Sequence, residues 1–172
     1  EDELRLPKYS GSLLRGQFGA ALRRIACMTG AKECSGCALL GTCPYPAIFD
    51  TPAPESHPLQ KFSRVPNPYV IEPPPFGLRH IGANEPLSFG MVLAGRALGQ
   101  LPHIAFALQR AFGHGVGNLR ARGSMEYLLF EDAGGERSIR ESGGTILPHA
   151  PRLAVPAFSD ASEAVLNIET PL

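Results

Sequence analysis

All four cysteines of this chain lie between positions 27 and 43, and this clustering is the strongest constraint that the sequence places on its fold. Two cysteines separated by two residues can present both thiolates to one metal ion from a single tight turn. Four thiolates in so short a segment can converge on one centre, so the spacing predicts a metal site. The run reads Cys27-x6-Cys34-x2-Cys37-x5-Cys43-Pro44.

Three uses of these cysteines are open. Structural zinc comes first, because zinc commonly takes four thiolate ligands in a closed tetrahedral site. An iron–sulfur cluster is the main alternative, since soft thiolates and the Cys43-Pro44 ending also suit one. Cysteines that bind no metal and become oxidised are the third use. Disulfides are less expected, because the sequence starts without the basic and apolar regions of an export signal.

Residues 113–123, here called the glycine-rich segment, contain four glycines and two arginines. Glycine has no Cβ, so an anionic ligand can approach the backbone amides directly. Arginine adds bidentate donors that suit a phosphodiester. The segment therefore predicts a phosphate-binding loop, and a flexible connector is the alternative. The predicted contacts are Gly113, Gly115, Gly117, Arg120 and Arg122.

The net charge is zero, but the charges are unevenly distributed. Residues 4–32 hold six basic residues and no acidic one, and residues 86–125 hold four basic residues and no acidic one. If the fold brings these two acid-free segments together, they form a surface of one sign that suits a polyanion. The basic residues are Arg5, Lys8, Arg15, Arg23, Arg24, Lys32, Arg96, Arg110, Arg120 and Arg122.

A helix is expected from Ser10 or Ser12, either of which can cap it, to about Met28. One face carries large apolar residues, which predicts a core stripe. The opposite face carries two glycines, which predicts close approach by another backbone or by a ligand. The stripe is Phe18, Ala21, Leu22 and Ile25, and Gly16, Gly19 and Arg23 lie opposite it.

The predicted order of elements is (strand)–helix–strand–strand–helix–strand, which is typical of the ferredoxin-like, split βαβ fold. The sequence thus predicts an α+β ferredoxin-like domain over residues 1–144, with a Cys-rich metal knuckle at about 27–46. Residues 145–172 are expected to form a linker and the first strand, at 164–169, of a second, truncated ferredoxin-like domain. The strands are expected at 4–6, 47–49, 69–72, 87–94, 125–131 and 137–140, and the second helix at 102–113.

Several of these motifs together resemble the N-terminal half of CRISPR-associated precursor-RNA-processing endoribonucleases of the RAMP superfamily. The resemblance covers roughly residues 4–130, and residues 164–172 resemble the first strand of that family's second domain. The motifs are Gly11-Ser-Leu-Leu-Arg-Gly-Gln-Phe-Gly19, Ala21-Leu-Arg-Arg24, Cys34-x2-Cys37-x5-Cys43-Pro-Tyr45 with Phe49, Phe89-x5-Gly95-Arg96-Ala97 and the glycine-rich segment.

The resemblance implies cleavage of the CRISPR repeat hairpin without a catalytic metal, by attack of a ribose 2′-OH on the neighbouring phosphate. It also implies that the repeat RNA, and other CRISPR effector subunits, are partners. Such a reaction needs a base, an acid and cationic donors. Many family members place a histidine at or just after the first helix, whereas this chain has Cys27, Met28 and Thr29 there.

His114 is the one histidine inside the glycine-rich segment, which makes it the candidate general base or an RNA contact. Three arginines of the first helix are expected to contact RNA, or else to form a solvated helix face. These are Arg15, Arg23 and Arg24. The remaining histidines, expected to be surface or packing residues, are His57, His80, His103 and His149.

Two other functional classes are open. A RAMP subunit could bind guide RNA in an effector complex without cleaving it, and a metal-containing protein-interaction module would bind no RNA. No run of about eighteen apolar residues occurs, so we expect no membrane span and a cytoplasmic location. The chain starts without methionine and ends in a strand-like run, so we expect a fragment of a longer protein.

Overall fold

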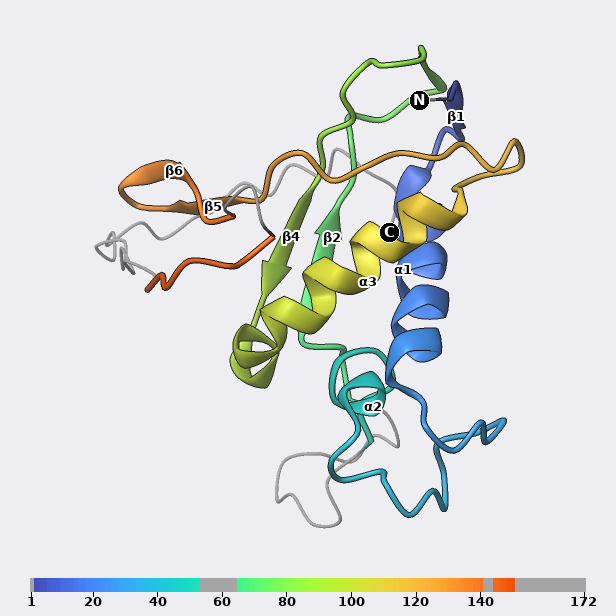
Figure 1. Ribbon diagram of the computed structural model, residues 1–172, viewed down its shortest axis with the longest axis vertical. Helices are drawn as coiled ribbons and strands as arrows, with labels where there is room; N and C mark the ends of the chain where they lie inside the picture. Colours follow the sequence, from blue (N-terminus) through green and yellow to red (C-terminus); the bar gives the residue numbers. More distant parts are fainter. Residues whose placement is uncertain (1, 53–64, 141–143, 151–172) are drawn as a thin grey trace, which may run out of the picture. The chain divides into compact units, whose positions relative to one another are not determined.

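The computed structural model describes residues 2–52, 65–140 and 144–150 of the 172-residue chain. Contacts divide the chain into two compact units, Glu1–Met125 and Glu126–Leu172. The fold is mixed α+β, and the strands within the described ranges pair as three two-stranded antiparallel sheets (Figure 1). The strand predicted at 164–169 lies outside the described residues.

The helices of the first unit are α1, Ser10–Ala26, α2, Pro44–Ile48, and α3, Leu101–His114. Helix α1 packs against both α2 and α3, and a short 3-10 helix, η1, Gly95–Gln100, precedes α3. The predictions of α1 and α3 are therefore confirmed. The strand predicted at 47–49 is wrong, because Pro44 lies in the first turn of α2, where its fixed φ favours a helix.

The start of α1 also differs from the prediction. The helix begins at Ser10 with Tyr9 as its N-cap, and no side chain makes a capping hydrogen bond there. A serine cap at Ser10 or Ser12 is therefore wrong, because Ser10 already has helical geometry and is buried. Close packing of the first turn replaces a polar cap.

The strands of the first unit form two separate pairs. In one pair, Leu4 lies opposite Ile81, and in the other, Tyr69 lies opposite Leu93. Strand β3 was not predicted, because it is short and largely polar, and β4 occupies only the second half of the predicted run. The bounds are β1, Leu4–Leu6, β2, Tyr69–Glu72, β3, Arg79–Ile81, and β4, Gly90–Leu93.

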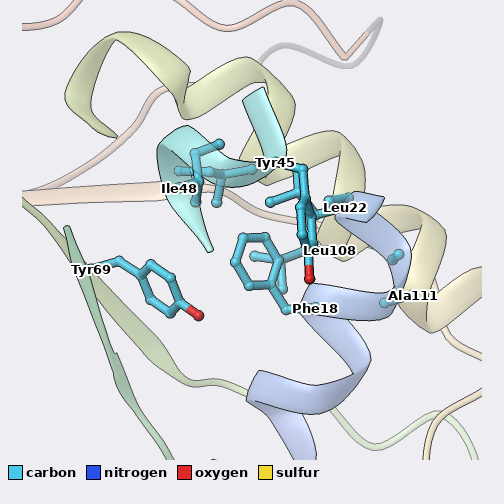
Figure 2. Close-up of a cluster of buried hydrophobic side chains, with 10 residues drawn as sticks. Phe18, Leu22, Tyr45, Ile48, Tyr69, Leu108 and Ala111 are labelled. Atoms are coloured by element: carbon cyan, nitrogen blue, oxygen red, sulfur yellow. The ribbon is translucent and has the colours of Figure 1, made fainter. Parts of the chain in front are cut away.

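The larger hydrophobic core lies where α1, α2, α3 and β2 meet (Figure 2). Phe18 of α1 is fully buried, and its ring meets the ring of Tyr69 edge to face at 5.4 Å between centroids. The predicted apolar stripe of α1 is confirmed, with Ile25 packed at the edge of the cluster. The labelled core residues are Phe18, Leu22, Tyr45, Ile48, Tyr69, Leu108 and Ala111.

A second, smaller core joins β1 and β3 to the glycine-rich segment. Val116 is fully buried there, and Ala121 is nearly so. Both pack in one cluster with Leu4, Leu6 and Ile81. Because its middle is anchored in this core, the glycine-rich segment is a folded loop rather than a free connector.

The second unit contains one described hairpin, formed by β5, Leu129–Asp132, and β6, Gly135–Ser138. Arg137 lies with its guanidinium 4.8 Å from the Phe130 ring centroid and 3.4 Å from a carboxylate oxygen of Asp132. The turn predicted at Gly134 and Gly135 lies one residue earlier, at Ala133 and Gly134, and Gly135 begins β6. The strands predicted at 125–131 and 137–140 are shifted, because the tight turn begins directly after Asp132.

Candidate functional site

The two acid-free segments fold into the same compact unit. Helix α1, from the first segment, packs against α3, from the second, and β1 shares a core with the glycine-rich segment. Two carboxylates that directly precede the first segment form ion pairs. Asp2 pairs with Arg122 at 3.6 Å, and Glu3 pairs with His80 at 3.1 Å.

The glycine-rich segment is closed by a pair of backbone hydrogen bonds between Val116 and Ala121, at 2.9 and 3.0 Å. Three residues around this closure have left-handed backbone angles: Gly115 at φ 99°, Gly117 at φ 74° and Arg120 at φ 51°. At Gly115, any Cβ would collide with the backbone carbonyl of Arg120. The glycine at position 115 is therefore required by the loop conformation itself.

The two arginines of the loop differ in their surroundings. The amide of Arg122 donates to Asp2 Oδ2 at 3.1 Å, and its guanidinium Nε lies 3.6 Å from the same oxygen. That amide, with the positive charge of Arg122, holds the pKa of Asp2 below its ordinary value. Arg120 is exposed, and none of the ion pairs in the described ranges includes it. Of the two loop arginines, Arg120 is thus the one that forms no ion pair with a carboxylate in the described ranges.

A hollow of about 240 Å³ lies between β1 and the loop. Its lining includes Arg5 of β1 and the loop residues Gly117 and Asn118. Gly117 itself approaches Leu4 and the carbonyl of Arg5, so the loop lies directly against β1. The hollow therefore brings residues of both acid-free segments to one place.

His114 is the last residue of α3 and is exposed. Its Nδ1 lies 2.8 Å from the carbonyl oxygen of Arg110. A carbonyl can only accept, so Nδ1 carries the hydrogen in this contact, and the neutral ring then has its lone pair on Nε2. The predicted general base therefore has a free nitrogen that could accept a proton.

The three predicted arginines of α1 occupy different environments. Arg23 donates to the carbonyl oxygens of Ala31 and Lys32 and lies 5.5 Å from the Tyr45 ring centroid. Arg15 lies over Phe49 and Tyr69, at 5.2 and 5.7 Å from their centroids. Arg24 is exposed to solvent. Arg23 thus holds the segment after α1, while Arg24 presents its charge outward.

A group that sequence reasoning missed consists of Lys8, Tyr9 and Phe76, here called the lysine–aromatic group. The two rings meet edge to face at 5.0 Å, and Lys8 Nζ lies 4.9 Å from the Phe76 centroid and 5.9 Å from that of Tyr9. Tyr9 is 53% exposed and Phe76 is 51% exposed. A lysine beside a tyrosine was visible in the sequence, but the partner from the proline-rich region was not.

All four cysteines line one small hollow of about 20 Å³, between the end of α1 and the start of α2. Cys27 follows α1, Cys43 precedes α2, and the amide of Cys37 donates to the Cys34 carbonyl at 3.1 Å, which closes the turn between them. The four thiols form no disulfide. As placed, no three His, Cys, Asp or Glu side chains of the described chain converge closely enough to hold a metal ion.

The thiols influence one another electrostatically. Burial raises the pKa of Cys34, and the negative charges of Asp50, Cys43 and Cys27 raise it further, against the opposing effect of Arg23. The Thr29 hydroxyl, through a hydrogen bond, lowers the pKa of Cys27. The four thiols therefore line one hollow, although no three of them converge as a metal-binding group in the described chain.

No helix within the described residues is both long enough and apolar enough to cross a bilayer. Comparison with curated proteins and with solved structures finds no match for the chain. The family AF_1859_N, described as an N-terminal domain, matches residues 1–151. This range includes the cysteines, the glycine-rich segment and the lysine–aromatic group. The chain therefore belongs to the AF_1859_N N-terminal domain family.

Proposed function

We propose that this chain binds the repeat hairpin of a CRISPR precursor transcript and is the N-terminal part of an endoribonuclease that cleaves it. The observation that carries the proposal is the packing of the two acid-free segments into one unit, with α1 against α3. This packing brings two segments that together hold ten basic residues and no acidic one into the same unit, on a chain whose net charge is zero. Such a local excess of positive charge favours binding to a polyanion.

The order of elements supports a ferredoxin-like domain. The described elements follow the order β1, α1, α2, β2, β3, β4, η1, α3, β5 and β6, which agrees with the split βαβ order if α2, β3 and η1 are taken as insertions. The described strands pair two by two, so a single ferredoxin-like sheet is part of the proposal. The matching family is described as an N-terminal domain. This description agrees with the proposal that a second domain would bind the other side of the RNA.

The glycine-rich segment is proposed to hold the RNA backbone. The amides of Gly115 and Arg120 donate to backbone carbonyls within the fold, so the support comes from the exposed guanidinium of Arg120, which has no carboxylate beside it in the described chain. A bidentate cation of this kind suits a phosphodiester. Further proposed phosphate contacts are Gly113, Gly115, Gly117, Arg122, Arg15, Arg23 and Arg24.

The lysine–aromatic group adds a site for an unpaired base. Half-exposed aromatic rings offer a face on which a base can stack, and Lys8 can pair with the adjacent phosphate. The two segments that carry the rings are joined by a backbone hydrogen bond, in which the Gly77 amide donates to the Lys8 carbonyl at 3.3 Å. We infer that this group contacts single-stranded RNA that flanks the hairpin.

The proposed reaction is a transesterification. A base removes the proton of the ribose 2′-OH, the oxygen attacks the neighbouring phosphorus, and the P–O5′ bond breaks with protonation of the leaving oxygen. The products are a 2′,3′-cyclic phosphate and a 5′-hydroxyl. His114 Nε2 is the proposed base, and Arg120 is the proposed donor to the phosphorane charge. None of these steps requires a metal ion.

A non-catalytic RAMP subunit is the second candidate. It is favoured by one observation: residues 27–29, which follow α1, are Cys, Met and Thr, where many related endoribonucleases place a histidine. In that case the same surface would hold guide RNA inside an effector complex, and His114 would be an RNA contact only.

Incubation of the full-length protein with end-labelled repeat RNA in EDTA separates the two candidates. Cleavage to a 2′,3′-cyclic phosphate, abolished by a 2′-deoxy substitution at the cleaved nucleotide, supports the endoribonuclease. Binding without cleavage supports the subunit, and absence of binding at low salt overturns both. His114→Ala should lower the cleavage rate by about 100-fold or more if His114 is the base, whereas His103→Ala, at the other end of α3, serves as the control.

A further inference from the structure

We propose that the four cysteines bind one metal ion, Zn²⁺, as four thiolates, and so fasten the end of α1 to the start of α2. The ligands are Cys27, Cys34, Cys37 and Cys43. This inference is independent of RNA binding. It assigns a structural centre to a part of the chain for which the proposed reaction has no use.

The first support is the position of the thiols in the fold. Cys27 is the C-cap of α1, Cys43 is the N-cap of α2, and Cys34 and Cys37 lie on one turn between them. All four line the same hollow. Binding of one ion would require the sulfurs to lie closer together than they do here, since no three metal-binding side chains of the described residues converge. Tetrahedral zinc sites take a pair with this spacing from a tight turn and a second pair from flanking elements.

The second support is the shell around the thiols. The hydroxyl of Thr29 lies 3.8 Å from Cys27 Sγ and 3.6 Å from Cys37 Sγ, so two sulfurs face the same oxygen. A hydroxyl can donate to a thiolate, and hydrogen bonds of this kind from outer groups orient metal ligands.

Arg23 is the positioning residue of this shell. Its guanidinium donates to the carbonyl oxygens of Ala31 and Lys32, which folds the segment between Cys27 and Cys34 back onto α1. Four thiolates around Zn²⁺ carry a net charge of −2. A nearby guanidinium lowers the electrostatic cost of that charge.

The third support is the lack of other structure in this segment. Residues 27–43, all of which the structure describes, contain turns but no helix or strand. Connections of this length without regular structure are uncommon in compact domains. A metal that draws four of these residues together supplies the organisation that a helix or strand would otherwise give.

Zinc is the proposed occupant because four thiolates in a closed tetrahedral site are a common ligand set for it. An iron–sulfur cluster is the alternative. Both occupants use the same four thiolates, so the experiment must tell them apart.

The test is the metal content of the full-length protein, purified without chelators and without oxygen. We expect about one zinc per chain, and loss of that zinc in the double variant Cys34→Ser, Cys37→Ser. Ser35→Ala, on the same turn, is the matched control and should retain the metal. Iron with acid-labile sulfide would overturn zinc as the occupant, and absence of any stoichiometric metal would overturn the site.

Two further measurements test the metal site even if the cysteine variant does not fold. Alkylation of the unaltered protein should modify all four cysteines only after chelation, and equal modification before and after chelation would overturn the site. Arg23→Gln should weaken zinc binding by about 10-fold to 100-fold, because outer-shell groups typically contribute this much. Arg24→Gln, one residue further on the exposed face of α1, should leave the affinity unchanged.

Discussion

Gly19 lies directly against the ring of Phe49, so that a Cβ at position 19 would overlap three ring atoms. The Phe49 ring is held there by stacked contacts with Tyr45, at 5.5 Å, and Tyr69, at 6.3 Å. A glycine within a helix costs about 1 kcal/mol relative to alanine. Here that cost is offset by the packing of a large ring into the space that the missing side chain leaves.

We predict that Gly19→Ala lowers the free energy of unfolding by about 1–3 kcal/mol, because overpacking forces Phe49 out of its position. Gly16→Ala is the control on the same helix, since nothing lies within 4 Å of its Cβ position. That substitution should raise the free energy of unfolding by up to about 1 kcal/mol. Urea denaturation of both variants measures the difference, and equal effects would contradict the packing of Phe49 on Gly19.

Gly115→Ala is expected to distort the glycine-rich loop. Its φ of 99° is unfavourable for alanine, and the new Cβ would meet the Arg120 carbonyl. The loss of stability should be about 1–3 kcal/mol. Gly99→Ala has open space around it and should be neutral. Thermal unfolding and RNA affinity of the two variants measure these effects. If Gly115→Ala keeps both the stability and the RNA affinity of the unaltered protein, the conformation of the loop is not needed for either.

Arg120→Ala and Arg122→Ala are both expected to weaken binding of the repeat hairpin and to flatten its salt dependence. Each lost phosphate contact should reduce the slope of log K against log salt by about one, because fewer counterions are released. Arg137→Ala, whose side chain pairs with Asp132, is the matched control. Filter binding across a salt titration measures the slopes. If both variants have the slope of the unaltered protein, the loop does not contact the RNA.

Phe76→Ala is expected to weaken binding of single-stranded RNA by about 1–3 kcal/mol, the usual contribution of one stacked base. Binding of a blunt hairpin without flanking nucleotides should change little. Leu78→Ala removes an 84% exposed apolar side chain without a ring and is the control. Competition binding with flanked and blunt hairpins separates these effects, and equal losses for both RNAs would argue against stacking.

The pKa of the Asp2 carboxyl should lie below its ordinary value, and part of that shift should persist in Arg122→Ala. The reason is that the first cause of the shift is the backbone amide of residue 122, which the substitution retains. Because the pKa is lower in the folded state, this contact stabilises the fold above the unfolded pKa of about 3.9. Its contribution is lost as the pH falls through the folded pKa. NMR titration of Asp2 in both proteins measures the shift, and an ordinary pKa in the variant would assign the effect to the guanidinium instead.

Both long helices could be predicted because their signals are local. The apolar period of α1 and the Pro102 start of α3 lie within each helix, and each helix buries the expected face. Strand β3 could not be predicted, because Arg79–Ile81 is a strand only through pairing with Leu4–Leu6 more than seventy residues away. The five-residue helix α2 was missed for a related reason, since a short apolar run fits a strand or a helix equally well.

The spacing of the cysteines, the uneven charge and the periods of the two main helices were determined by the sequence alone, because each depends on neighbours within a few turns of chain. Tertiary structure decided the partners of individual side chains. It placed Arg23 on the carbonyls of the cysteine segment, brought Phe76 to Lys8 and Tyr9, and gave Arg122 but not Arg120 a carboxylate in the described chain. These contacts join segments that are distant in sequence, and only the packing of a common core brings such segments together.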